Sequence, residues 1–65
     1  MMKPYQQRVV LERDELSEKI DKLRTFLDDQ KSVQVVRADE LDRLHRQHIV
    51  MRAYLAILNE RIAHF

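Results

Sequence analysis

The sequence predicts an all-α protein, an antiparallel helical hairpin of coiled-coil type that associates into a homo-oligomeric helical bundle. The chain has 65 residues, no glycine, no cysteine and a single proline, Pro4. Most of its other residues are strong helix formers, and apolar side chains recur at helical spacing in two segments. A chain of this length buries only about 60% of its unfolded surface, so we expect partner chains to complete the core.

The first helix is expected over residues 4 to about 29. Pro4 suits the first helical turn, where a backbone N–H has no helical partner in any case. The apolar positions fall on one narrow side of a helix; they are Tyr5, Val9, Leu16, Ile20, Leu23 and Leu27. The stripe breaks once, at Glu12 and Arg13. The pattern predicts a helix with one buried side.

The second helix is expected over residues 39 to 65, after a joint over residues 30 to 38. Its apolar residues alternate between spacings of three and four, which is a heptad seam; they are Leu41, Leu44, His48, Met51, Leu55, Leu58, Ile62 and Phe65. The joint can hold a helical turn, and Ser32 and Asp39 are candidate caps. So short a connection favours antiparallel neighbours, and we expect one domain over residues 1–65.

The antiparallel arrangement also predicts which residues face each other. Pairing Leu27 with Leu41 beside the joint places Tyr5 near Ala63 at the other end. The two chain ends should therefore lie together, away from the joint.

The second helix has more apolar surface than one neighbouring helix can cover. With Val50, Tyr54 and Ile57 added to the seam, its apolar arc reaches roughly 200°, against a little over 100° for an ordinary core-facing helix. A second copy of the hairpin would cover it. The expected oligomer interface consists of Val50, Tyr54, Ile57 and Phe65. The alternative is that Val50 and Ile57 are simply exposed.

Four residues of the second helix are candidate contacts with a ligand or partner: Arg43, Gln47, Tyr54 and Arg61. The guanidinium group of arginine binds phosphate through two parallel hydrogen bonds, and a tyrosine ring can stack on a base. In an oligomer these side chains could frame a nucleotide-sized pocket. They are equally typical of protein–protein interfaces, so both interpretations stay open.

The charge pattern does not favour nucleic acid as a partner. Twelve basic and eleven acidic residues give a net charge of +1. Arg43, Arg46 and Arg52 could contact phosphates, but they scatter around the helix instead of sharing one side. Charge does differ between the ends of the hairpin. Acidic residues gather near the joint, namely Asp28, Asp29, Asp39, Glu40 and Asp42, and basic residues gather near the termini, namely Lys3, Arg8, Arg61 and His64.

No catalytic set, cofactor or metal site is predicted. Without glycine, a phosphate-cradling loop of the dinucleotide-binding type cannot be built. His45 and His48 have a spacing that can hold zinc, but two ligands are not a site, and His48 is expected at the core edge, bonded to a polar neighbour. No apolar run is long enough to span a bilayer, and the first residues lack the apolar stretch of a signal peptide. We expect a non-enzymatic cytoplasmic protein.

Three stretches resemble a family of short tailed-phage and prophage proteins of unknown function: YQQRVV (5–10), ELSEKIDKL (15–23) and MRAYLAILNERI (51–62). The resemblance implies a small accessory protein in the cytoplasm of an infected or lysogenic bacterium, where it would bind and block a host component, including one of host defence. The first hypothesis is therefore a homo-oligomer that binds an unknown host protein. The second, by architecture alone, is an oligomeric sponge that sequesters a cyclic nucleotide signal. A nucleic-acid-binding accessory is third.

Overall fold

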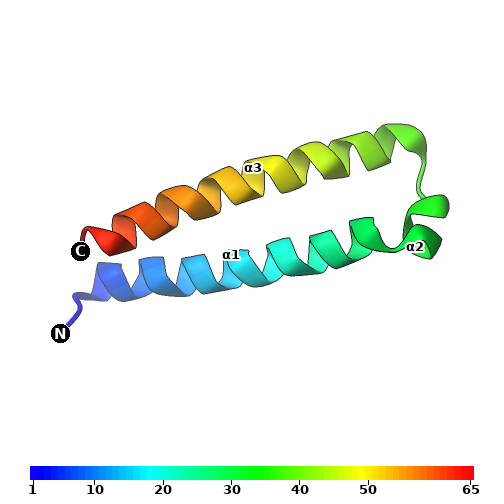
Figure 1. Ribbon diagram of the computed structural model, residues 1–65. Coiled ribbons are helices and arrows are strands. Elements are labelled where there is room, and N and C mark those ends of the chain that lie inside the picture. The colour runs from blue at the N-terminus through cyan, green and yellow to red at the C-terminus, as the bar shows by residue number, and fades with distance from the viewer.

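The computed structural model describes all 65 residues and contains three helices and no strand: α1 (Pro4–Asp28), α2 (Gln30–Gln34) and α3 (Ala38–Ala63). α1 and α3 lie side by side and antiparallel, with the short α2 at the turn and both chain ends at the opposite end (Figure 1). The prediction of an all-α helical hairpin is confirmed. None of the helices combines the length and the apolar composition that crossing a bilayer requires.

The joint is organised by Asp29. This residue leaves the helical backbone conformation and so ends α1, while its carboxylate accepts hydrogen bonds from the backbone N–H of Lys31 and the hydroxyl of Ser32 at the start of α2. Arg37 precedes α3 and makes no side-chain capping hydrogen bond. Ser32 and Asp39 are therefore not the caps that the sequence suggests. Asp39 lies within the first turn of α3 instead, where a negative charge favours the helix dipole.

The core is a single narrow seam between α1 and α3. Four side chains are buried, namely Val9, Leu16 and Ile20 of α1 and Leu58 of α3. Partly buried residues of α3 pack against them; these are Met51, Leu55 and Ile62. Leu58 alone is fully enclosed, with 0% of its surface exposed. The contact between α1 and α3 therefore centres on Leu58.

Three further contacts fix the register of the two helices. They join Tyr5 to Phe65, Glu12 to Tyr54 and Arg13 to Asn59. The rings of Tyr5 and Phe65 meet edge to face with centroids 6.0 Å apart. Tyr5 thus contacts the last residue of the chain, two positions beyond the Ala63 that the sequence places near it.

The hairpin is long and thin. It measures 48 × 15 × 14 Å, and its radius of gyration is 14.8 Å, whereas a compact domain of this length has about 11 Å. Its accessible surface is 5274 Å², whereas a compact protein of 7.9 kDa exposes roughly 4,400 Å². One hairpin therefore exposes roughly 900 Å² more than a compact chain of the same mass would.

His48 is the one polar residue of the α3 seam. Its side chain is half-buried, and its Nε2 atom is buried without a hydrogen-bond partner. The expectation that a polar neighbour bonds this ring was wrong, because α1 turns its apolar side toward the seam. A buried polar atom left without a partner costs about 1–3 kcal/mol. His48 is therefore a weak point of the core.

Replacing Leu58 with alanine should lower the free energy of unfolding by roughly 2–5 kcal/mol, because the change opens a cavity at the centre of the seam. Ile49→Ala is the matched control, since Ile49 is 64% exposed and its truncation should change stability by only about 0.5 kcal/mol. Urea unfolding at equal protein concentration, followed by circular dichroism, measures both. Equal losses in the two variants would contradict a seam centred on Leu58.

Replacing His48 with leucine should keep the fold and raise the free energy of unfolding by roughly 1 kcal/mol, because it removes the unpartnered nitrogen and restores an apolar heptad position. His45→Leu serves as control because His45 is exposed. Thermal unfolding of both variants checks this expectation. A marked loss of stability in the His48 variant would show that the imidazole makes a hydrogen bond the fold needs.

Candidate ligand and partner surface

An apolar strip on α3 lies beside the seam and is open to solvent. We define the α3 strip as Val50, Tyr54 and Ile57, which are 66%, 41% and 54% exposed. Spacings of four and three residues put these side chains on one side of the helix. Phe65, the fourth residue of the expected interface, is also 41% exposed, although its ring contacts Tyr5. α1 contacts the α3 strip at Tyr54 and leaves most of its surface exposed, and the role of the strip as an oligomer interface stays a prediction.

Tyr54 is held in place from across the hairpin. Its hydroxyl donates a hydrogen bond to the carboxylate of Glu12 in α1. On the other side of the seam, Arg13 Nη1 donates to Asn59 Oδ1 at 3.1 Å. The interruption of the apolar stripe at Glu12 and Arg13 is thereby explained, because these two residues flank the seam and bond to α3. The hydrogen bond fixes one edge of the Tyr54 ring and leaves much of the ring accessible.

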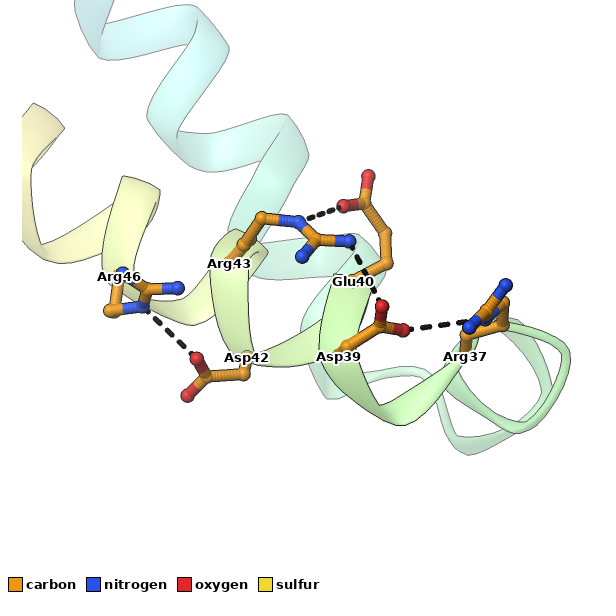
Figure 2. Close-up of polar contacts among 6 residues, drawn as sticks. All are labelled: Arg37, Asp39, Glu40, Asp42, Arg43 and Arg46. Carbon is orange, nitrogen blue, oxygen red and sulfur yellow. Dashed lines mark hydrogen bonds and ion pairs between the residues drawn. The ribbon is translucent and has the colours of Figure 1, made fainter.

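Arg43 is occupied by carboxylates of its own helix (Figure 2). Its Nε atom donates to Glu40 Oε1 at 2.9 Å, and its Nη2 atom lies 3.4 Å from Asp39 Oδ2. The hydrogen bond to Glu40 raises the pKa of Arg43 above its ordinary value. Arg46 is paired in the same way with Asp42, at 3.0 Å. Two of the three arginines of the nucleic-acid hypothesis are thus neutralised locally.

Arg61 has a different environment. It is exposed, forms no ion pair, and lies in the last turn of α3, where its positive charge favours the helix dipole. Gln47 is also exposed and makes only a weak contact, from its Nε2 atom to Met51 Sδ at 3.7 Å. Of the two predicted arginine contacts on α3, only Arg61 keeps its charge free.

The four predicted contact residues do not enclose a cavity within one chain. Arg43, Gln47, Tyr54 and Arg61 follow one side of α3, but the hairpin contains no pocket. A ligand pocket normally surrounds most of its ligand. Any pocket built from these residues therefore requires a second surface facing α3.

The histidines are not brought together with further metal ligands. No group of three or more His, Asp or Glu side chains is arranged to hold a metal ion. His64 Nδ1 lies 2.7 Å from the backbone carbonyl of Glu60 and follows the last turn of α3, whereas His45 and His48 lie in the first half of that helix. The fold therefore brings no third metal ligand to His45 and His48.

Residues 3–64 match the model of a protein family described as Sequestin. No curated protein and no solved structure matches the chain. The matched region spans all three helices and includes Arg43, Gln47, Tyr54 and Arg61. Of the residues discussed above, only Phe65 lies outside it.

Changing Val50 and Ile57 together to glutamate should disrupt the predicted oligomer and leave a smaller, still helical species, because like charges would meet across its symmetric interface. Its thermal stability should fall, since assembly would no longer add to folding. Sedimentation velocity and circular dichroism measure the two effects. Leu11→Glu with Ile49→Glu is the matched control, because both side chains are exposed apolar residues outside the strip. An unchanged size in the first variant would show that the α3 strip faces solvent.

Proposed function

The chain belongs to the Sequestin family, and from this we propose that it is a non-enzymatic homo-oligomer that binds and withholds a nucleotide. The name of the family supports capture, without chemical change, as the mode of action. The observation that carries the proposal is the accessible ring of Tyr54 on the side of α3 that also carries Arg61, an arginine without an ion pair. The resemblance to tailed-phage proteins supports action in the cytoplasm of an infected or lysogenic bacterium.

Tyr54 and Arg61 supply the two kinds of contact that a nucleotide needs. A base stacked on an aromatic side chain gains about 1–3 kcal/mol, and a hydrogen bond to a charged group about 1.5–3 kcal/mol. The hydrogen bond from Tyr54 to Glu12 restrains the ring before any ligand arrives. A restrained ring loses less conformational entropy on binding. These properties favour capture of a planar, negatively charged molecule.

The proposal requires a second copy of the chain, because one hairpin contains no pocket. The surface that the hairpin exposes in excess, roughly 900 Å², is close to the 800 Å² or so that each partner buries in a standard interface. A two-fold axis near the α3 strip would place the same residues of two chains opposite each other. The bound nucleotide would then lie between two copies of Tyr54.

A host protein is the second candidate partner. The observation that favours it is the exposure of Val50 and Ile57, since an apolar strip on a helix can equally dock an amphipathic helix of another protein. The nucleic-acid alternative is weaker, because the charges of Arg43 and Arg46 are compensated by carboxylates of α3.

Purified protein should bind at least one member of a panel of cyclic mononucleotides, cyclic dinucleotides and linear nucleotides, with one ligand for two or more chains. Calorimetry gives the stoichiometry, and free ligand at about 100 times its Kd should stabilise the fold by about 2.7 kcal/mol. Chromatography after denaturation should recover the nucleotide unchanged. A chemically altered product would contradict a non-enzymatic role, and the absence of any binding would leave the host protein as the partner.

A further inference from the structure

Arg8 of α1 is a second exposed arginine without an ion pair, and the fold brings it to the same part of the hairpin as Arg61. Five Lys and Arg side chains of the chain are ion-paired, at residues 13, 22, 37, 43 and 46, whereas Arg24 and Arg52 are unpaired like Arg8 and Arg61. The two termini lie together at one end of the hairpin (Figure 1), and the last turn of α3, which carries Arg61, lies at this end. Neither Arg8 nor Arg61 forms an ion pair. The charges of Arg8 and Arg61 are therefore available to an external anion.

Neither arginine has a free carboxylate three or four residues away on its own helix. Arg61 has no acidic side chain three or four residues away, which is the spacing at which helical ion pairs form. Arg8 has one, Glu12, but that carboxylate accepts the hydroxyl of Tyr54. The interhelical hydrogen bond thus engages the one carboxylate of α1 that is spaced to pair with Arg8.

Two contacts between the helices place Arg8 and Arg61 on one face of the hairpin. Tyr5 touches Phe65 at one end of this face, and Glu12 bonds Tyr54 at the other. Arg8 follows Tyr5 by three residues and precedes Glu12 by four, so it shares their side of α1. Arg61 precedes Phe65 by four residues and follows Tyr54 by seven, so it shares their side of α3. Both arginines lie between the two contacts.

We propose that Arg8 and Arg61 form a phosphate-binding subsite, beside the exposed rings of Tyr5 and Phe65. This inference rests on the proposed function and adds to it the contribution of α1 and the charge of the ligand. Two guanidinium groups suit a ligand with two or more negative charges, because each can bind a phosphate through two parallel hydrogen bonds. A diphosphate and the two phosphodiesters of a cyclic dinucleotide share this chemistry.

The test compares Arg8→Gln and Arg61→Gln with Arg52→Gln. Arg52 is exposed, has no ion pair, and lies nine residues from Arg61, which places it on the opposite side of α3. Each variant removes one positive charge and no buried group. Circular dichroism and thermal unfolding should show all three folded as the unaltered protein is.

Binding is measured by calorimetry with ADP, cyclic di-AMP and adenosine, and with their guanine counterparts. Arg8→Gln and Arg61→Gln should each weaken binding of the phosphorylated probes by about tenfold or more, whereas Arg52→Gln should leave it within about twofold. Adenosine and guanosine should bind weakly and equally to all four proteins. A preference for ADP or for cyclic di-AMP distinguishes a diphosphate from two separate phosphodiesters.

Wild-type affinity for the phosphorylated probes in the Arg8 and Arg61 variants would overturn the subsite and leave nucleotide capture standing. Equal weakening in the Arg52 variant would also overturn it, since the effect would then follow net charge and not position. Failure of the unaltered protein to bind any nucleotide would remove the proposed function and the subsite together.

Discussion

The contact of Leu58 with α1 determines which parts of the molecule remain free to act. Leu58 is the fully buried residue of α3, so α3 can take only one rotation about its own axis. Because successive helical residues are about 100° apart, Ile57 is turned away from α1 and Val50 lies on the same side as Ile57. Burying the heptad seam and exposing the α3 strip are therefore two consequences of one packing contact.

Polar contacts between α1 and α3 fix the alignment of the two helices, which the narrow apolar seam alone does not. A heptad pattern repeats every seven residues, so apolar packing alone permits neighbouring registers. Glu12 with Tyr54 and Arg13 with Asn59 lie on opposite sides of the seam and would both be lost in another register. Exposed hydrogen bonds of this kind contribute only about 0.5–1.5 kcal/mol each to stability. Their main effect is to align α1 with α3.

The sequence predicts the buried sides of the helices and their approximate alignment, and it misses the individual polar contacts between them. The alternation of three and four residues identifies the buried side of α3, because that spacing reflects helical geometry alone. The pairing of Arg43 with Glu40 could also have been anticipated from its spacing of three residues. The bond from Tyr54 to Glu12 could not, since it depends on the exact positions of two side chains across the seam. The sequence does not single out Asp29 as a cap, because several polar residues in and beside the joint have side chains that can cap a helix.

Although the net charge is only +1, the two ends of the hairpin carry charges of opposite sign. The hairpin is 48 Å long, whereas charges in physiological salt are screened over about 8 Å. The acidic residues of the joint therefore cannot neutralise the arginines at the termini. Near the joint, Arg43 is paired within its own helix, while at the other end Glu12 is engaged by Tyr54 and Arg8 has no partner. An anion approaching this end would meet the local positive charge, so the proposed phosphate-binding subsite is compatible with a chain that is nearly neutral as a whole.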